Sequence, residues 1–313
     1  MTESNLHPME RLKRELEQIL TAIPRKSRII YMEYPVYNNV GDLLIMKGTE
    51  KFFKDNEIEV VARYSFMNFR KKVKLPQDCI IVCQGGGNFG DLYRGPQQLR
   101  EYLVGNYPDN RIVILPQTIY YKSKENLKET AAIFNKHKDV HLFVRDEKSY
   151  EIIKNEFNVN AYLSPDMAHQ LWPIHVEEVA KKEVLHFIRT DDEINLKLEG
   201  TGSPEGDILD WPVLLSKLDH KTVNMFQFIS KIDRVMFNIL PIHKLWELYS
   251  DYLVNKSIKV FGEYQCISTS RLHGHILSCL MNKENVVIDN SYGKNSTYYD
   301  RWTKICDNVT LKK

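Results

Sequence analysis

The sequence has few features that would place it outside ordinary globular proteins. Its five cysteines form no Cys-x-x-Cys pair and lack the spacing of metal ligands, so reduced core thiols are the favoured interpretation. No uninterrupted apolar run approaches the roughly 20 residues that cross a membrane. Residues 1–24 carry charges throughout, unlike the apolar core of a secretion signal. The sequence therefore predicts a cytoplasmic protein with no bound metal.

Charge of either sign is also not in excess. The 43 Lys and Arg residues balance 41 Asp and Glu residues, giving a net charge of +2. We therefore expect no nucleic-acid partner, and any recognition of an anion has to be local. The 43% of hydrophobic and 27% of charged residues are typical of a globular protein. A length of 313 residues suits two domains of about 150 residues each.

Short apolar segments alternate with amphipathic helical segments along the chain. This alternation predicts an α/β fold with parallel sheets whose strands are buried on both faces. We expect two Rossmann-like domains that face a cleft. Residues 217–252 are predicted to hold one or two long helices, and residues 257–261 a strand or a turn. The predicted units are an N-terminal domain over residues 1–170, a C-terminal domain over 183–297, and a tail over 298–313 that crosses back to the first domain.

One stretch near the C-terminus combines cations with a predicted helix start. Three hydroxyl residues, 268–270, precede Arg271 and His273, and an apolar helical pattern follows. A helix N-terminus favours an anion, and Lys294 follows the next predicted strand. An Arg-x-His at a helix start can be mere surface and cap. The combination of cations, imidazole and hydroxyls instead favours a phosphate site.

A second stretch is rich in glycine. Gly85, Gly86 and Gly87 follow a predicted buried strand and lead into Asn88 and Asp91. Their order matches neither the dinucleotide fingerprint nor the P-loop of NTPases. Consecutive glycines serve a backbone that turns sharply and comes close to something else. The alternative is a tight strand-to-helix turn that packs on its neighbour.

Taken together and in this order, several motifs resemble those of the polysaccharide pyruvyl transferase family, over about residues 38–302. The resemblance implies a glycosyltransferase-B-like architecture whose C-terminal domain holds the donor. It further implies transfer of the enolpyruvyl group of phosphoenolpyruvate onto two hydroxyls of a sugar. The product would be a pyruvate ketal on a cell-surface polysaccharide or exopolysaccharide, with release of phosphate and no cofactor. The motifs are Asn39-Val-Gly41-Asp42, Gly85 to Asp91, Pro116-Gln-Thr118, Arg145-Asp146, Pro165-Asp166, Ser270-Arg-Leu-His273 and Asp289 to Lys294.

The resemblance also assigns roles to residues. Arg271 and His273 would bind the donor, and His273 suits a general acid because histidine titrates near neutrality. Asp42 or Asp91 would orient or deprotonate the acceptor. Further expected donor ligands are Ser270, Lys294, Arg145 and Arg189, with either of the last two a candidate for a further family arginine. Expected acceptor-side residues are Asn39, Gly41, Asp42, Gly85, Gly86, Gly87, Asn88 and Asp91.

Two other functions stay open at this point. A glycosyltransferase of the same fold would use a nucleotide sugar and would need a pocket for the base and ribose. A non-catalytic, anion-binding subunit of a polysaccharide assembly would bind without turnover. The expected partners are phosphoenolpyruvate and a sugar or lipid-linked oligosaccharide. Contact with the inner face of the membrane through the acceptor lipid, and self-association, are left open.

Overall fold

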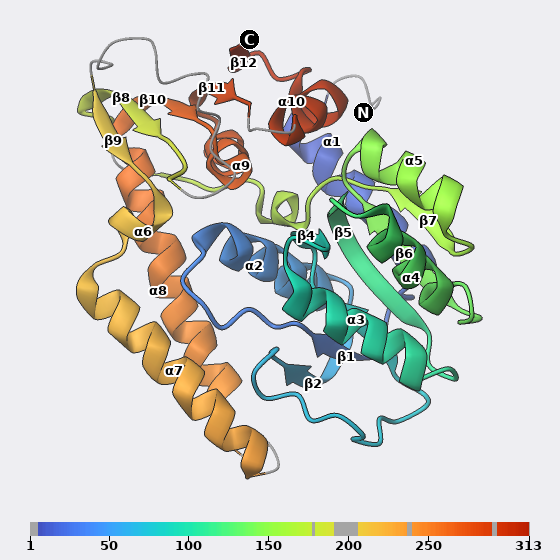
Figure 1. Cartoon of the computed structure of the whole chain (residues 1–313). Coiled ribbons are helices and arrows are strands. Elements are labelled where there is room, and N and C mark those ends of the chain that lie inside the picture. Colours follow the sequence, from blue (N-terminus) through green and yellow to red (C-terminus); the bar gives the residue numbers. More distant parts are fainter. Residues whose placement is uncertain (1–5, 177–178, 191–205, 237–239, 290–292, 313) are drawn as a thin grey trace.

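The computed structural model describes residues 6–176, 179–190, 206–236, 240–289 and 293–312. Within these ranges the chain is an α/β protein with two parallel sheets, one in each half of the sequence (Figure 1). The predicted α/β class with parallel sheets is confirmed. No helix in the described ranges is long and apolar enough to span a bilayer.

The first sheet has the strand order β2-β1-β3-β5-β6-β7, and β4 pairs with β5 beyond this path. All of its described pairings are parallel. The chain adds β2 on one side of β1 and β3 on the other, so the strand order reverses there. Open α/β sheets bind ligands at such a reversal, beyond the carboxyl ends of the strands. The strands are β1 (Arg28–Met32), β2 (Glu59–Tyr64), β3 (Ile80–Cys83), β4 (Gly86–Gly90), β5 (Ile112–Tyr120), β6 (Val140–Val144) and β7 (Asn160–Leu163).

The second sheet has the order β12-β11-β10-β8-β9 and is also parallel in all described pairings. Its strand order reverses at β8, which has β9 on one side and β10 on the other. Both sheets therefore have a reversal point at which loops can form a ligand site. The strands are β8 (Lys182–Phe187), β9 (Asp207–Leu209), β10 (Tyr264–Thr269), β11 (Glu284–Ile288) and β12 (Val309–Lys312).

Helices connect and cover the strands. One apolar core joins side chains of both halves, because α2 packs against α8, α9 and η3. A second core fills the other face of the first sheet. The helices are α1 (Pro8–Glu15), η2 (Leu16–Thr21), α2 (Val40–Asp55), α3 (Arg94–Asn106), α4 (Lys124–Phe134), α5 (Glu147–Glu156), η3 (Met167–Leu171), α6 (Trp211–Leu214), α7 (Lys217–Val235), α8 (Ile242–Gly262), α9 (Leu272–Leu280), α10 (Lys294–Tyr298) and η5 (Tyr299–Thr303).

The structure corrects three local expectations. Residues 257–261 belong to helix α8, which continues to Gly262, and not to a strand or a turn. The glycine-rich stretch contains a short strand, β4, that pairs with β5. Helix α9 begins at Leu272 with Arg271 as N-cap, and no side chain caps it directly. The hydroxyl of Thr269 instead accepts from the backbone N–H of Arg271, at 3.0 Å.

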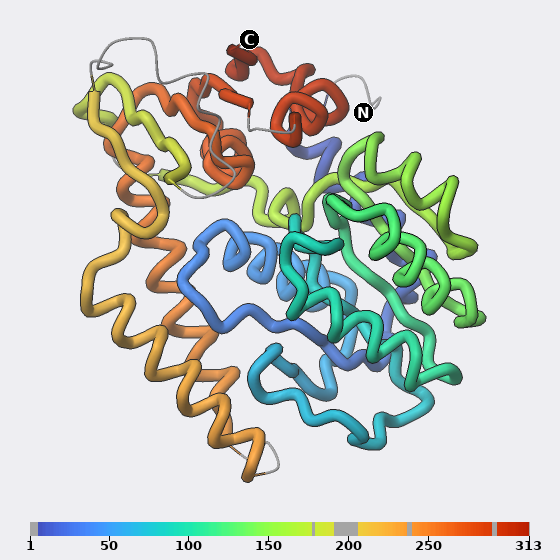
Figure 2. The backbone as a smooth tube through the Cα atoms, in the orientation of Figure 1, coloured from blue at the N-terminus to red at the C-terminus, as the bar shows by residue number. Residues whose placement is uncertain are grey.

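The C-terminal tail contacts both halves of the chain. The indole Nε1 of Trp302 donates to the backbone oxygen of Arg145 at 2.9 Å, and the Tyr298 hydroxyl accepts from the N–H of Asp166 at 3.1 Å. Figure 2 shows α10 and η5, in red, beside the green helix α5 of the first half. The last strand, β12, then pairs with β11 in the second sheet. The tail therefore meets the first half through Tyr298 and Trp302, whereas its final strand lies in the second sheet.

Candidate active site

A pocket of about 350 Å³ is lined by residues from both halves of the chain. Its residues follow the carboxyl ends of strands in both sheets, at or near the two points where strand order reverses. The first half contributes Tyr37, Asn39, Asp42, Gly87, Asn88, Tyr93, Pro96 and Arg145. The second half contributes Arg189, Trp211, Arg271, Leu272, His273 and Lys294.

The charges that line this pocket are mostly positive. Three arginines, a lysine and a histidine face one carboxylate, Asp42, among the described lining residues. Guanidinium and ammonium groups are the side chains that bind phosphate and carboxylate. The pocket thus has the composition of a site for a small anion with several negative charges.

Asp166 holds two of the cationic groups in place. Its Oδ2 lies 3.2 Å from the Nε2 of His273 and also accepts from the Nη1 of Arg145. The Asp166 side chain is fully buried. Burial alone would raise the pKa of Asp166, but the positive charges of His273 and Arg145 hold it well below its usual range. Asp166 is therefore a buried anion that orients a histidine and an arginine toward one pocket.

Arg145 has an unsatisfied donor at the pocket. Its residue is fully buried, and its Nε donates to the hydroxyl of Thr118 at 3.0 Å. Its Nη2 has no hydrogen-bond partner within the described part of the chain. Buried polar groups are nearly always paired, and a guanidinium loses much solvation when it is buried. Since Arg145 lines the pocket, an anionic ligand is the natural partner for Nη2.

Two glycines leave the room that these cations occupy. A Cβ on Gly87 would lie 2.5 Å from the Nζ of Lys294 and 2.9 Å from the Nη2 of Arg145. A Cβ on Gly41 would lie 2.8 Å from the Nδ1 of His273. The imidazole of His273 therefore packs directly on the first turn of α2. Because Gly87 has no side chain, the positive groups of Lys294 and Arg145 can lie close together beside it.

Arg271 is oriented by a carboxylate that is not among the candidate residues predicted from the sequence. Its Nε and Nη2 donate to the two oxygens of Asp210, at 2.8 and 2.7 Å. Asp210 is buried and also accepts from the N–H of Thr190, at 3.0 Å. This two-point pairing fixes the plane of the guanidinium. Asp210 thus positions Arg271 at the pocket from the loop that follows β9.

Asp42 is the acidic group of the pocket. It follows Asn39, whose Nδ2 donates to the Asp42 carboxylate at 2.8 Å. Burial raises the pKa of Asp42, and this effect outweighs His273, the Tyr37 hydroxyl and the nearby cations, which favour the carboxylate. A carboxylate with a raised pKa is suited to accept a proton from a substrate hydroxyl.

The structure also places the other expected donor residues. Arg189 and Lys294 line the pocket. Ser270 instead supports the loop, since its hydroxyl accepts from the N–H of Arg189 at 2.9 Å. The backbone oxygen of Ser270 accepts from the side-chain amide of Asn295, at 2.8 Å. These contacts tie the loops after β8 and β10 to each other and to the start of α10.

Asp91 does not reach the pocket. Its carboxylate accepts from the N–H groups of Lys122 and Ser123, at 2.8 and 2.9 Å, and from the amide of Asn126. Burial would raise the pKa of Asp91, but these hydrogen bonds lower it below its usual range. Asp91 therefore holds the start of α4 and is not among the residues that line the pocket, so we give it no part in the proposed mechanism, in contrast to the catalytic and acceptor-binding roles expected from the sequence.

The other acceptor-side glycines support the pocket from behind. A Cβ on Gly85 would lie 2.9 Å from the backbone oxygen of Pro116. Gly86 has a φ of +142°, which L-residues rarely adopt, and lies near the Asp42 carboxylate. Both glycines therefore permit the tight path of the chain from β3 into β4, as the interpretation of a packed turn expects.

Several residues of the site were missed from the sequence: Tyr37 and Trp211 line the pocket, and Asp166 and Asp210 hold its cations in place. Asp166 and Asp210 each follow a strand, and Pro165-Asp166 is one of the family-like motifs, which was a usable signal. Tyr37 and Trp211 had no such signal in the sequence, because an aromatic residue near a strand end is more commonly part of the core. Burial and charge pairing, which depend on the fold, identify these four residues.

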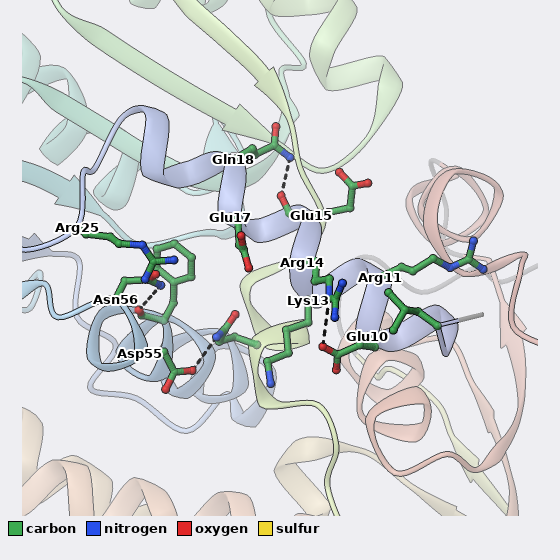
Figure 3. Close-up of a pocket in the computed structure, with 13 residues that line it drawn as sticks. Glu10, Arg11, Lys13, Arg14, Glu15, Glu17, Gln18, Arg25, Asp55 and Asn56 are labelled. Atoms are coloured by element: carbon green, nitrogen blue, oxygen red, sulfur yellow. Dashed lines mark hydrogen bonds and ion pairs between the residues drawn. The ribbon is translucent and has the colours of Figure 1, made fainter. Parts of the chain in front are cut away.

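A larger hollow of about 1020 Å³ lies beside α1 and η2, away from the residues singled out in the sequence (Figure 3). Its side chains carry charges of both signs and partly pair with one another. Arg14 lies 3.7 Å from Glu10, and the amide of Gln170 donates to Asp55 at 2.8 Å. Such a surface has no excess of cations, so the smaller pocket is the better site for an anion.

Comparison with known proteins identifies the family of the chain. The family profile described as polysaccharide pyruvyl transferase matches residues 39–292. A Bacillus subtilis protein named "Putative pyruvyl transferase EpsO" is 49% identical over 297 residues, which are 95% of this chain and 92% of that protein. Pyruvyl transferase 1 of Schizosaccharomyces pombe is 25% identical over 295 residues, which are 89% of this chain and 70% of the yeast protein.

A solved structure shares the fold. The crystal structure of an uncharacterised Klebsiella pneumoniae protein matches with a TM-score of 0.64 at 20% identity, over 96% of this chain and 98% of that one. This likeness concerns the fold alone. The profile and the identity to the Bacillus protein show the family: the chain belongs to the polysaccharide pyruvyl transferases. It is a transferase, and pyruvyl transfer in polysaccharide biosynthesis is the activity of its class.

Proposed function

We propose that the chain transfers the enolpyruvyl group of phosphoenolpyruvate to two hydroxyls of one sugar, forms a cyclic pyruvate ketal and releases phosphate. The observation that carries the proposal is the buried, unpartnered Nη2 of Arg145 in a pocket with three further cations. Phosphoenolpyruvate is small and carries a phosphate and a carboxylate. Both groups match guanidinium and ammonium donors.

The donor would lie between the two halves of the chain. Arg145 and Lys294, which approach each other at Gly87, are placed to bind one anionic group together. Arg189 and Arg271 offer cations from the opposite sheet for the other anionic group. The orientation of the donor depends on the acid, because the methylene carbon that is protonated has to face His273. This requirement determines which pair of cations binds the phosphate and which binds the carboxylate.

His273 supplies the proton in this mechanism. A proton passes from its imidazole to the methylene carbon, which makes the neighbouring carbon electrophilic. One sugar hydroxyl then forms a bond to that carbon. The bond between the same carbon and the phosphate oxygen breaks, and phosphate leaves with the bonding electrons. A second hydroxyl of the sugar forms a bond to the carbon and closes the ketal. The buried carboxylate of Asp166 holds the imidazole in position for this transfer. Asp42, with its raised pKa, accepts the proton of the first hydroxyl, and the imidazole of His273, neutral after its transfer, accepts the proton of the second.

The architecture of the chain supports an acceptor approaching from the first half. We place the chain among glycosyltransferase-B-like folds, with two Rossmann-like halves and the pocket between their strand ends. Asn39, Asp42 and Asn88 line the first-half wall of the pocket and offer hydrogen-bonding groups to a sugar. The acceptor would be a sugar or a lipid-linked oligosaccharide precursor of an exopolysaccharide, in the cytoplasm, and no cofactor or metal takes part.

Turnover tests this function directly. Purified protein is incubated with phosphoenolpyruvate and candidate saccharides, and phosphate release is followed beside the mass of the saccharide. Phosphate release with a mass gain of one pyruvate less water is the expected result. Thermal stabilisation by nucleotide sugars, with none by phosphoenolpyruvate, would instead identify a glycosyltransferase. Stabilisation by phosphoenolpyruvate without turnover on any acceptor would indicate a binding subunit.

A further inference from the structure

A recess of about 110 Å³ opens beside the cationic pocket. The two spaces share three lining residues, Tyr37, Asn88 and Pro96, so a ligand can extend from one into the other. The recess begins at the end of β1, where the first sheet reverses its strand order. Its other lining residues are Glu33, Tyr34, Val36, Ser65, Phe66 and Met67.

Glu33 is an unusual residue to find at the wall of this recess. It is only 7% exposed, and it has a φ of 62°, a conformation that non-glycine residues adopt rarely. Its Oε2 accepts from the Nε of Arg100 at 2.9 Å. Its Oε1 has no hydrogen-bond partner within the described residues. A strained backbone that carries a half-satisfied buried carboxylate is typical of a functional site.

Arg100 links this carboxylate to the cationic pocket. Its Nη1 and Nη2 donate to the backbone oxygen and to the Oδ1 of Asn88, at 3.1 and 2.5 Å. Because the Oδ1 of Asn88 accepts from Arg100, the side-chain NH₂ group of Asn88 points away from Arg100 and can donate to another partner. Asn88 lines both spaces. It therefore presents a hydrogen-bond donor where the recess meets the pocket.

An exposed aromatic ring lines the recess. Phe66 is 54% exposed, which is high for a phenylalanine, and it lines the recess. Its ring lies on α3, because a Cβ on Gly95 would lie only 3.0 Å from the Phe66 Cζ. An exposed ring beside a carboxylate and an amide is the arrangement that binds a sugar: the ring covers the C–H face and the polar groups take the hydroxyls.

We infer that this recess is a hydroxyl-binding subsite for the saccharide acceptor, in which Glu33 Oε1 accepts from a sugar hydroxyl, Asn88 donates, and Phe66 covers the ring. The inference rests on the proposed function for its placement beside the donor. Burial raises the pKa of Glu33 to about 7 against the opposing effect of Arg100, which makes acceptor binding sensitive to pH near neutrality.

Saccharide binding without turnover tests the subsite. Saturation-transfer NMR measures binding of the methyl glycosides of glucose, galactose, mannose and N-acetylglucosamine to the wild type, Glu33→Gln, Phe66→Ala and a control, Phe228→Ala. Phe228 is a similarly exposed ring on α7. We expect at least one glycoside to bind the wild type and the control, with about tenfold weaker binding or more in the other two variants.

The outcome separates this inference from the proposed function. Phosphoenolpyruvate should stabilise Phe66→Ala and the wild type equally, since the recess lies outside the cationic pocket. Absence of that stabilisation in the wild type contradicts the proposed function but not the subsite. Absence of glycoside binding to the wild type, or unchanged binding in Phe66→Ala, overturns the subsite. Phe66→Ala removes a surface ring, so it keeps the test valid if Glu33→Gln fails to fold.

A second, independent feature is the outer face of α7. The helix packs on α8 through one face, where Val223, Phe226 and Ser230 are buried. Its opposite face is apolar and exposed over almost the whole length of the helix. The side chains, at helical spacing, are Leu218 (72% exposed), Met225 (50%), Phe228 (64%), Ile232 (39%) and Val235 (76%). Figure 1 shows α7 at the outer edge of the molecule.

The exposed charges of α7 have one sign. Lys217, Lys221, Lys231 and Arg234 are exposed, whereas both acidic residues, Asp219 and Asp233, are buried. Asp219 accepts from Lys256, and Asp233 accepts from a backbone N–H of the turn after the helix. The outer face therefore combines large apolar side chains with cations alone. This is the pattern of a helix that lies on an anionic lipid surface.

We propose that this face of α7 docks on the anionic surface of a membrane. A second copy of the chain is the poorer occupant, because a symmetric contact would bring lysines against lysines. Helix α7 follows α6, whose Trp211 lines the cationic pocket, so docking keeps the pocket near the lipid surface. A lipid-linked acceptor, if the proposed function holds, would then reach the pocket from its own membrane.

Vesicle binding tests the docking face. Sedimentation compares vesicles of phosphatidylcholine alone with vesicles that contain about one third phosphatidylglycerol. We expect the wild type to bind the anionic vesicles, less so at high salt, and the double variant Phe228→Ser, Val235→Ser to lose about tenfold or more of that binding. Val179→Ser, at an 83% exposed apolar residue elsewhere, is the control and should bind like the wild type. No binding by the wild type, equal binding by the double variant, or a stable dimer that the double variant abolishes would overturn the proposal.

Discussion

The Nε2 of His273 lies 3.2 Å from the Oδ2 of Asp166, although 107 residues separate the two in the chain. One residue follows a strand of the second sheet and the other follows a strand of the first. The contact therefore exists only when the two halves are assembled. Because the carboxylate is buried and held ionised, it accepts a hydrogen bond from the imidazole and fixes the orientation of the ring.

Replacing this carboxylate should reduce turnover more than donor binding. In Asp166→Asn the imidazole loses the carboxylate that orients it toward the donor, so kcat should fall by about 10²-fold or more. Arg145 also loses its charged partner, which should lower the free energy of unfolding by about 3 kcal/mol. Asp91→Asn, at a carboxylate outside the pocket, is the control. Phosphate release and urea unfolding measure the two effects, and normal turnover in Asp166→Asn would contradict the proposed acid.

A methyl group at Gly87 should obstruct the donor cations. The added Cβ would lie 2.5 Å from the Lys294 Nζ and 2.9 Å from the Arg145 Nη2, so both groups would have to move. We expect Gly87→Ala to weaken phosphoenolpyruvate binding by about tenfold, without a large loss of stability. Gly105→Ala, where the nearest atom would lie 3.9 Å away, is the matched control. Calorimetric titration checks this, and equal affinities would show that the donor binds elsewhere.

Substitutions at Arg271 and at Asp210 should have the same effect on donor binding. The Arg271→Lys substitution keeps the charge but cannot form two parallel hydrogen bonds to Asp210. Asp210→Asn keeps the shape but removes the charge of the partner. Both variants should raise the phosphoenolpyruvate KM by about tenfold, because each releases the same guanidinium from its fixed plane. Steady-state kinetics with varied donor decide the matter. A normal KM in Asp210→Asn would leave Arg271 without its proposed positioning residue.

The two histidines of α9 should behave differently on replacement by asparagine. His273→Asn removes the proposed acid and should lower kcat by about 10²-fold, while the cations retain part of donor binding. His275 is fully buried between Asn285 and Thr303, with contacts of 2.6 and 2.8 Å. His275→Asn should therefore lower stability with little direct effect on chemistry. A stable His273→Asn enzyme with normal kcat would place the acid elsewhere.

Stability should fall at moderately acidic pH. Burial lowers the pKa of His169 and of His275 to about 4. An unfolded chain, where histidine titrates near pH 6.5, binds protons that the folded protein excludes. The contribution of these two rings to the free energy of unfolding is therefore fully present above about pH 6.5. As the pH falls toward 4, the free energy of unfolding decreases by up to roughly 3 kcal/mol for each ring. Urea midpoints across this range measure it. A flat profile between these limits would show that neither ring excludes its proton.

Much of the fold was predictable, because burial on both faces gives parallel strands a recognisable apolar pattern. Residues 140–144, for example, have this apolar pattern and form β6, in which all five residues are buried. The prediction of a strand or a turn at residues 257–261 was wrong because Val and Ile in a short apolar run suit a strand as well as a buried helix. The end of a helix is decided by what it packs against, and there α8 packs on the second sheet.

The site was predictable in part for a similar reason. Cations that follow strand ends tend to meet at one edge, and Arg145, Arg271, His273 and Lys294 do so. Which carboxylates accompany them was not predictable. Asp91 follows a strand-like segment as Asp166 does, but its oxygens find backbone N–H groups close by. The choice between a local and a distant partner depends on the assembled structure.

The contacts of Trp302 and Tyr298 limit how short the chain can be made. A fragment that ends soon after Lys294 would contain every residue that lines the cationic pocket. It would nevertheless lack the indole that holds the backbone of Arg145 and the hydroxyl that holds the backbone of Asp166. Ends trimmed for crystallisation or fused to a reporter should therefore be chosen beyond η5, since the final helical turns support the charged pair from outside the pocket.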